Sequence, residues 1–318
     1  MKPDIRFSVV IPTHNRAHLI GRAVASARRQ SYPPVEIIVV DDGSMDETPS
    51  RVAGFGGLVR YLRQSKAGVA AARNRGVAEA QSEWIAFLDS DDIWFEHHLD
   101  RMAQAIQATA GAADFYFSDA RLPALDEGRS LWQVSGFAIN SDFEIVTDAT
   151  PWVMMSWPPM LLQASVFGRS AYLESAGLWE QLETREDTHL FLKIGLGGSA
   201  CAVAGCGVQL TADDAAHRLT QAHGPHKPGG HEMRVLLYQD ILGGKPGLAP
   251  EHRRELRARL ASAHRHLARL AWQEQRLAVA VRHVGRSLIV NPGFPLRYAR
   301  PWLVAKAKSL DRVETNLL

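Results

Sequence analysis

Three aspartates that stand close together are the residues of this sequence best suited to hold a cation. Asp89, Asp91 and Asp92 follow a short apolar run, residues 83–88, that has the character of a buried strand. Carboxylate oxygens are ligands that Mg²⁺ and Mn²⁺ prefer, and no Cys and His set beside the cluster points to Zn²⁺. The cluster therefore predicts a bound Mn²⁺ or Mg²⁺ that also takes phosphate oxygens. The alternative is a solvated turn in which Asp92 caps a helix that begins near Phe95.

A second pair of carboxylates, Glu186 and Asp187, comes just before an apolar helical face that includes Leu190 and Ile194. Acidic residues in the first turn of a helix are favoured by the partial positive charge at that end. A charge-stabilised helix start is therefore a sufficient explanation of the pair when it is taken alone.

The elements around the aspartates predict a parallel sheet. Continuous apolar runs predict buried strands at residues 7–11, 35–40 and 83–88, and helical spacing over residues 17–30 and 67–81 predicts the helices between them. Strands joined in this way are parallel, so their carboxyl ends lie at one edge, where open α/β folds bind ligands. We therefore expect an α/β fold with three polar clusters at that edge: Pro12-Thr13-His14-Asn15, Asp41-Asp42 and Asp89-Ser90-Asp91.

Composition and charge limit the class of protein. The 318 residues are 46% hydrophobic, which is enough to bury a core in one large domain or two. The formal charge is only +2, but residues 251–318 carry +9 and the rest carries −7. The two cysteines, Cys201 and Cys206, are too few for a disulfide framework and are expected in the core. With no signal-peptide pattern and no long apolar run, we expect a cytoplasmic protein, with peripheral attachment at the inner membrane face as an option.

Four motifs in order, VVIPTHNR, IIVVDDGS, KAGVAAARNRG and IAFLDSDD, resemble the N-terminal half of family 2 glycosyltransferases. The resemblance implies the GT-A fold, a mostly parallel Rossmann-like sheet flanked by helices. The helical, Arg-rich pattern of residues 251–290 adds a helical extension at the C-terminal end. It also implies inverting transfer of a sugar from a nucleotide diphosphate donor. UDP is the default nucleotide because it is the commonest in the family, and dTDP and GDP stay open. The expected partners are thus a UDP-sugar and a glycan or lipid-linked acceptor. No nucleic acid is expected, because nothing in the sequence resembles a nucleic-acid recognition module.

The resemblance also implies roles for single residues. Asp41 or Asp42 would accept a hydrogen bond from the base, although residues 42–44 taken alone are an ordinary turn. Asp89 and Ser90 would face the ribose or the sugar, and Asp91, with Asp89, would hold the metal. The other residues expected around the nucleotide or the donor sugar are Pro12, Thr13, His14, Arg16, Lys66, Gly68 and Asn74. For Asn74 the alternative is a solvated helix face.

In this family a Glu-Asp pair at the head of the acceptor helix supplies the general base. By position that base is Asp187, with Glu186 beside it in the catalytic site. Its carboxylate would remove the proton of the acceptor hydroxyl as the oxygen attacks the anomeric carbon. His217 is a candidate metal ligand and Arg218 a candidate diphosphate contact. His223, His226 and His231 form either a separate zinc site or, more simply, exposed histidines.

The expected domains are a glycosyltransferase domain over residues 1–230 and a basic helical extension over residues 231–318. Within the first, residues 1–120 would bind the nucleotide sugar and residues 121–230 would face the acceptor. Residues 121–158 look irregular, and their tryptophans either stack on sugar or lipid or pack into the core. The basic and aromatic segment 292–308 suits either an anionic membrane surface or packing onto the catalytic domain.

Two other classes of protein share parts of this pattern. One is a sugar- or nucleotide-binding protein with this fold and no turnover, which the presence of Asp89, Asp91 and Asp187 disfavours. The other is a nucleotidyltransferase, which would have a Gly-rich loop after the first strand where this chain has Pro12-Thr13-His14-Asn15.

Overall fold

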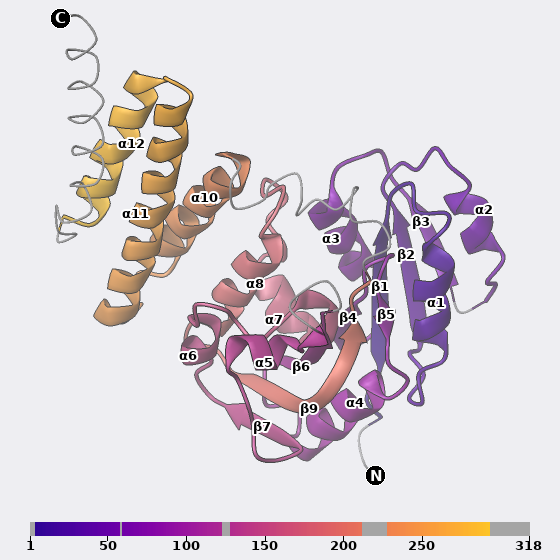
Figure 1. The fold of residues 1–318 in the computed structure, drawn as a ribbon. Coiled ribbons are helices and arrows are strands. Elements are labelled where there is room, and N and C mark those ends of the chain that lie inside the picture. The colour runs from indigo at the N-terminus through magenta and orange to yellow at the C-terminus, as the bar shows by residue number, and fades with distance from the viewer. Residues whose placement is uncertain (1–3, 58, 123–127, 212–227, 293–318) are drawn as a thin grey trace, which may run out of the picture. The chain divides into compact units, whose positions relative to one another are not determined.

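The computed structural model describes residues 4–57, 59–122, 128–211 and 228–292 (Figure 1). Contacts divide the chain into two compact units, Met1–His252 and Arg253–Leu318. The sequence predicts a boundary between residues 230 and 231. The contacts instead divide the chain after His252, so helix α10 (Pro228–Gly244) falls in the first unit. Among the described residues, none of the helices combines the length and the apolar character needed to cross a membrane.

Among the described residues, a nine-stranded sheet forms the core of the first unit, in the order β3-β2-β1-β4-β8-β6-β9-β5, with β7 also paired to β9. Strands β1 to β4 are parallel, β6 and β9 run in the same direction as they do, and β5, β7 and β8 run against them. This confirms the predicted α/β class with a mostly parallel sheet. The strands are β1 (Phe7–Thr13), β2 (Glu36–Asp41), β3 (Val59–Arg63), β4 (Trp84–Phe87), β5 (Ile93–Trp94), β6 (Phe115–Arg121), β7 (Phe143–Val146), β8 (Ser165–Gly168) and β9 (Ala200–Gln209).

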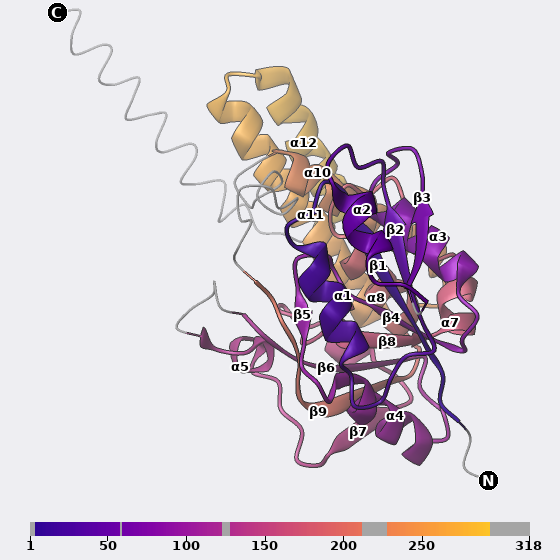
Figure 2. The ribbon, with the colours of Figure 1, turned by 90° about the vertical axis from the view of Figure 1, so that its right-hand side faces the viewer.

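Helices cover both faces of the parallel part of the sheet. Helices α1 and α2 lie on one face and α3 on the other, and α1 is in front of the sheet in the rotated view (Figures 1 and 2). The reason is that the connection from β3 to β4 returns across β2 and β1, so a right-handed crossover puts its helix on the opposite face. In the part of the chain that the structure describes, the helices of this unit before α10 are α1 (Ile20–Arg28), α2 (Thr48–Ala53), α3 (Val69–Glu79), α4 (His98–Ala108), α5 (Leu131–Ser135), α6 (Thr150–Val153), α7 (Arg169–Glu174) and α8 (Glu186–Gly195), with a 3₁₀ turn, η2, at Leu162–Ala164.

Two local expectations were wrong. Asp92 does not cap a helix near Phe95, because β5 follows it and α4 begins only at His98. Residues 121–158 are not simply irregular, since α5, β7 and α6 form there; each is only four or five residues long, too short for a periodic signal. Trp132 is buried, and its indole N–H donates to the Pro159 carbonyl at 2.9 Å, so this tryptophan packs into the core.

The second unit contains the helical pair α11 (Pro250–Gln273) and α12 (Leu277–Val290). The Ser287 hydroxyl donates to the Ala261 carbonyl at 3.1 Å, and the Nδ1 atoms of His264 and His283 are 3.0 Å apart. Residue numbers therefore rise along one helix as they fall along the other. The helical extension expected for this region therefore contains two antiparallel helices.

Candidate active site

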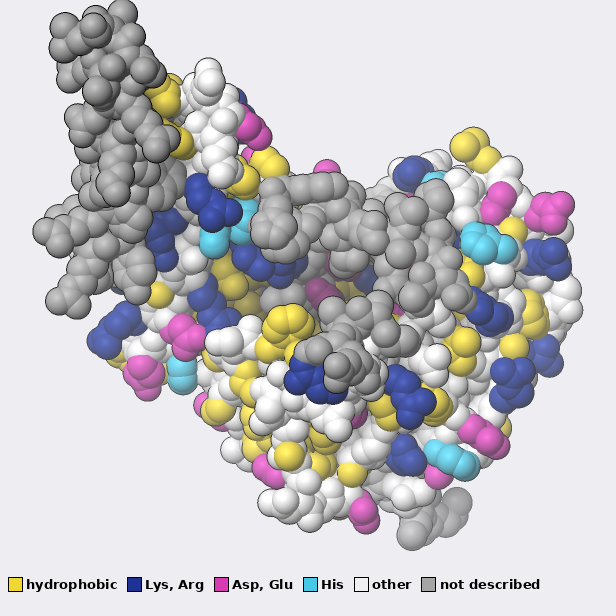
Figure 3. Space-filling model, viewed as in Figure 1, with side chains coloured by type: hydrophobic (Ala, Val, Ile, Leu, Met, Phe, Trp, Pro, Cys, Tyr) yellow, Lys and Arg dark blue, Asp and Glu magenta, His cyan; other side chains and the backbone are white. Residues whose placement is uncertain are grey.

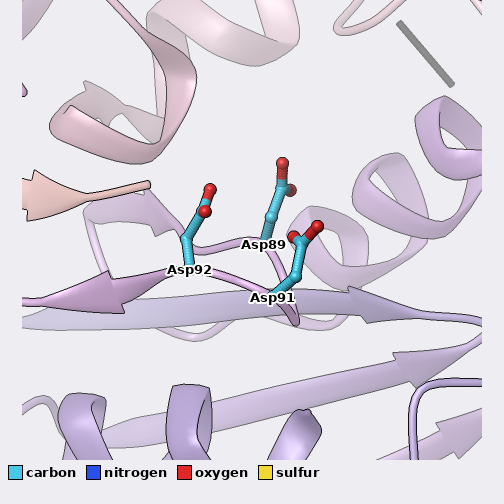
Figure 4. A group of neighbouring side chains, drawn as sticks. All are labelled: Asp89, Asp91 and Asp92. Carbon is cyan, nitrogen blue, oxygen red and sulfur yellow. The ribbon is translucent and has the colours of Figure 1, made fainter. Parts of the chain in front are cut away.

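The turn between β4 and β5 holds Asp89, Asp91 and Asp92, whose carboxylates point to the same side (Figure 4). One ligand oxygen from each lies within 4.8 Å of the others. The main chain of Thr211, just after β9, donates to Asp92 at 3.1 Å, and the Thr211 hydroxyl donates to the Asp91 carbonyl. The residue that follows β9 therefore holds the turn in place. Its all-oxygen donor set suits Mg²⁺ or Mn²⁺ rather than Zn²⁺.

Asp89 is held by two side chains that sequence reasoning missed. Arg73 Nη2 donates to Asp89 Oδ1 at 2.6 Å, and the Gln163 amide nitrogen donates to Asp89 Oδ2. The main-chain carbonyl of Gln163 accepts the Trp94 indole N–H at 2.7 Å. Gln163 lies 74 residues from Asp89 in the sequence and Arg73 lies 16 residues from it, on the preceding helix, so the orientation of Asp89 depends on the assembled fold.

Arg73 also reaches the start of α8. Its Nη1 donates to Glu186 Oε1 at 2.7 Å across 113 residues of sequence, and the Arg73 residue is only 4% exposed. Burial by itself would lower the pKa of Arg73, but the charges of Asp89 and Glu186 outweigh it and raise that pKa above its usual value. A charged guanidinium thus ties the aspartate turn to the carboxylate pair. Its position in an Ala-rich helix carried no sequence signal for this role.

The two carboxylates at the head of α8 have different surroundings. Glu186 is buried; burial raises its pKa, the positive charge of Arg73 opposes that change, and the negative charge of Asp187 adds to it. Asp187 is half-buried, and its Oδ1 accepts the Thr188 N–H at 2.6 Å. Arg185, just before them, has a left-handed backbone with φ of 69°, which makes the helix start abruptly. Of the pair, Asp187 is the carboxylate that a second molecule can reach more easily.

Helix α8 is anchored on its other side by α10. His189 is buried, and its Nε2 lies 2.8 Å from Asp240 Oδ2. Burial lowers the pKa of His189, and the hydrogen bond and charge of Asp240 oppose that change. Helix α10 therefore helps to fix the helix that carries Asp187.

The residues expected around the nucleoside gather where β1 and β2 end. Thr13 pairs with Asp41 in the sheet, and Asp41 accepts hydrogen bonds from the Ser44 main chain at 2.7 Å and from the Tyr61 hydroxyl. Pro12 is buried within β1, and the main chain of Arg16 donates to the Thr48 hydroxyl at 3.2 Å. Within the described part of the chain, the buried Thr13 Oγ1 and His14 Nδ1 have no hydrogen-bond partner.

Asp42 organises the loop that leads to α3. Its carboxylate accepts the Gln64 amide and the main-chain N–H groups of Ala67 and Gly68, each at 2.8 Å. Gly68 has φ of 100°, a conformation that favours glycine, at the N-terminal end of α3. Lys66 lies in this loop, so Asp42 positions the segment that the sequence assigned to the donor.

Asn74 has four structural contacts instead of a solvated position. Its amide nitrogen donates to the Leu178 carbonyl and to Glu180, and its oxygen accepts from the Tyr172 hydroxyl and the Leu178 main chain, all within 2.7–3.0 Å. These contacts tie α3 to the segment after α7. Ser90, in the aspartate turn, is buried.

Several expected residues lie outside the described part of the chain. They are His217, Arg218, His223, His226 and the basic and aromatic residues beyond 292. His231 is described, and it is buried in α10 rather than exposed.

Comparison with known proteins gives a family and named relatives. Residues 8–148 match the family described as glycosyl transferase family 2. The chain is 40% identical over 131 residues to the succinoglycan biosynthesis protein ExoO of Rhizobium meliloti, covering 41% of this chain and 36% of ExoO. It is 37% identical over 99 residues to WfgD of Escherichia coli, a UDP-Glc:alpha-D-GlcNAc-diphosphoundecaprenol beta-1,3-glucosyltransferase, covering 30% of this chain and 39% of WfgD. The chain thus spans less than two fifths of these curated relatives.

A solved structure extends the similarity of fold over most of the chain. The crystal structure of TarS residues 1–349 from S. aureus, in complex with UDP-GlcNAc, is similar with a TM-score of 0.67. The similarity covers 92% of this chain and 82% of that one at 18% sequence identity. At that identity the comparison shows a shared fold.

Proposed function

Because residues 8–148 belong to glycosyl transferase family 2, we propose that this protein is an inverting glycosyltransferase. It transfers a sugar from a nucleotide diphosphate donor, a UDP-sugar by preference, to a hydroxyl group of a glycan or lipid-linked acceptor. The names of WfgD and ExoO support a UDP-sugar donor and a role in building polysaccharide. The cytoplasmic location expected from the sequence is part of this proposal.

One observation carries the proposal: Arg73 joins Asp89 at the aspartate turn to Glu186 at the start of α8. Transfer needs a cation-binding edge for the diphosphate and a base for the acceptor within reach of one reacting centre. The Arg73 bridge brings residues of both kinds into one hydrogen-bonded unit. If the aspartate turn and the start of α8 had only local structural roles, they would not require a buried, charged arginine between them.

The donor side would hold the cation and the nucleotide. Asp91 and Asp89 are the proposed ligands of Mn²⁺ or Mg²⁺, with His217 as a further candidate. The bound cation would neutralise the negative charge that develops on the leaving diphosphate. Arg218 would contact that diphosphate. The nucleoside and sugar would lie against Pro12, Thr13, His14, Arg16, Asp41, Asp42, Lys66, Gly68, Asn74, Asp89 and Ser90.

On the acceptor side, Asp187 is the proposed general base and Glu186 its supporting neighbour. The Asp187 carboxylate takes the proton of the acceptor hydroxyl while the oxygen bonds to the anomeric carbon and the carbon–phosphate oxygen bond breaks. Glu186 is less suited to be the base because it is buried against Arg73. A single displacement of this kind inverts the configuration at the anomeric carbon.

The first experiment is a thermal-shift screen against UDP, dTDP, GDP and CDP, with and without Mn²⁺. A nucleotide at 100 times its dissociation constant stabilises the protein by about 2.7 kcal/mol. We expect a metal-dependent shift that is largest for UDP. Well-folded protein that responds to no nucleotide under any of these conditions would contradict the donor assignment.

The second experiment compares Asp187→Asn with Glu186→Gln, two neighbouring variants that each lose one charge. Asp187→Asn should keep the UDP- and Mn²⁺-dependent thermal shift while transfer from the UDP-sugar falls by about 10²-fold or more. Glu186→Gln should keep part of its activity, because a glutamine can still accept a hydrogen bond from Arg73. Near-normal transfer by Asp187→Asn would remove Asp187 from the mechanism, and the reverse order of effects would make Glu186 the base.

A further inference from the structure

Helix α12 presents an apolar stripe to solvent that the proposed chemistry does not use. Leu277, Val281, Val284 and Leu288 are all exposed, with Val281 at 67%. Their spacing of four, three and four residues puts them on one side of the helix, because successive residues turn by about 100°. Hydrophobic side chains are visible on the upper part of the α11–α12 hairpin in Figure 3.

The stripe continues into a wide apolar arc. Gly285 and Ile289 follow it around the helix, and Ile289 is 81% exposed. The side of α12 next to Val284 packs in the hairpin, where Ala280 and Ser287 are buried. An apolar arc with no polar residue within it is unusual on a soluble helix and marks an interaction surface.

Arginines border this arc on both sides. Arg282 and Arg286 follow Ile289 around the helix and are exposed. On the other border, Arg265 of α11 places its Nη1 3.4 Å from the Ser287 hydroxyl. Helix α12 itself has no acidic residue, and residues 253–290 contain nine arginines and two glutamates. An apolar centre with a basic rim complements a surface whose interior is apolar and whose rim is anionic.

We propose that α12 docks on an anionic lipid surface, with the stripe of Leu277, Val281, Val284 and Leu288 inserted among the acyl chains at the headgroup boundary. Interfacial helices place their apolar face about 5–10 Å into that boundary, and each nearby arginine adds attraction to anionic headgroups. The hairpin then holds the enzyme at a membrane. A lipid-linked acceptor would lie in the same surface.

The charges also favour a lipid surface over two other candidates for the stripe, a second copy of the chain and residues 293–318. A second copy of the chain would bring an identical arginine-bordered hairpin to the stripe, and like charges would repel. Residues 293–318 also carry more basic than acidic side chains, so they offer no charge complement either. An anionic lipid surface is the occupant that satisfies both the apolar stripe and the arginines.

The test is co-sedimentation of the full-length protein with vesicles of phosphatidylcholine, with or without phosphatidylglycerol. Binding should require phosphatidylglycerol, and it should weaken from 0.1 M to 1 M salt, as the screening length falls from about 10 Å to about 3 Å. Equal binding to neutral vesicles, or no binding at all, would overturn the proposal.

Two double variants locate the surface. Val281→Ser with Leu288→Ser removes the centre of the stripe, and Arg282→Ala with Arg286→Ala removes one border. Each should weaken binding by at least tenfold, about 1.4 kcal/mol, while the melting temperature stays near that of the wild type. The matched control is Leu173→Ser with Met45→Ser, two exposed apolar residues of the first unit, and it should bind normally.

Two results would show that α12 does something else. Wild-type binding by both α12 variants would assign any vesicle binding to another segment, such as residues 293–318. Concentration-dependent dimers that the serine variant abolishes, measured by light scattering without lipid, would make a second copy the occupant. Either result rejects the lipid surface, while sugar transfer to a water-soluble acceptor is measured independently of both.

Discussion

Replacing Arg73 with methionine is the sharpest test of how this site is built, because methionine keeps most of the side-chain length and removes the charge. The change leaves Glu186 and Asp89 without the guanidinium that joins them at 2.7 Å and 2.6 Å. The side chain of Glu186 is 11% exposed and that of Asp89 is 23% exposed. Asp89 also keeps its bond from Gln163, so most of the penalty falls on Glu186.

The size of the loss follows from the burial of the pair. Removing one partner of a buried ion pair costs about 3–5 kcal/mol, because the remaining charge is left without compensation. A domain with a total stability of about 5–15 kcal/mol would still fold. We therefore expect the free energy of unfolding of Arg73→Met to be about 3–5 kcal/mol below that of the wild type at pH 8.

The loss should also depend on pH. Burial raises the pKa of Glu186 and Arg73 opposes that change, so removing Arg73 raises the pKa further. A carboxyl group whose pKa is higher in the folded state binds a proton on folding. Its destabilising effect therefore grows as pH rises above about 4.3, the usual pKa of a glutamate side chain, and disappears below that pH. The stability gap between Arg73→Met and wild type should shrink from pH 8 to pH 5.

The assay is urea unfolding at both pH values, with Arg75→Met as the matched control. Arg75 lies on the same helix and donates to the Arg63 carbonyl at 2.7 Å, so losing it should cost only about 1 kcal/mol. If Arg73→Met is no less stable than Arg75→Met at pH 8, or if its deficit is unchanged at pH 5, the ion-pair reasoning is wrong. Transfer activity should fall by about 10²-fold as well, because groups at the reacting centre lose their positions.

Asp91→Ala should abolish the Mn²⁺-dependent part of the UDP thermal shift, and an undiminished shift would exclude Asp91 as a ligand. The pKa of His98 is lowered to about 3 by burial and by the charge of Arg101. Because the unfolded chain takes up that proton near pH 6.5, His98 should cost about 2 kcal/mol of stability between pH 7 and pH 5. His98→Leu should remove this part of the pH dependence in urea titrations, and an unchanged slope would show that His98 is protonated in the folded state. Gly76→Ala would place a Cβ 2.3 Å from a methyl group of Val10 and should cost about 1–3 kcal/mol in the same assay. Gly54→Ala, with only ordinary contacts, is the control and should be near neutral.

Much of the fold followed from local sequence patterns. The apolar runs that predicted strands at residues 7–11, 35–40 and 83–88 correspond to β1, β2 and β4, and the helical spacing between them corresponds to α1 and α3. These elements are long or fully buried, so their periodicity reports their environment. Elements of four or five residues, such as β7 and α6, give no periodic signal and were missed.

The residues of the site likewise include some that the sequence predicted and some that it did not. Its acidic residues could be found from sequence because Asp89, Asp91 and Asp92 are neighbours in the chain and follow a recognisable strand. Their partners could not be found, because Gln163 reaches Asp89 across 74 residues. Similarly, the hydrogen bonds of Asp42 to the loop before α3 span up to 26 residues.

The sequence by itself thus determined the parallel α/β class, the family resemblance and the edge of the sheet where chemistry is expected, since each depends on residues close together in the chain. Only the tertiary structure decided that Arg73 joins Asp89 to Glu186, and that Asp187 is the more exposed member of its pair. The reason is that hydrogen bonding and burial are set by which distant elements pack together. A sequence pattern records the preferences of a segment, but not the partner that the fold brings to it.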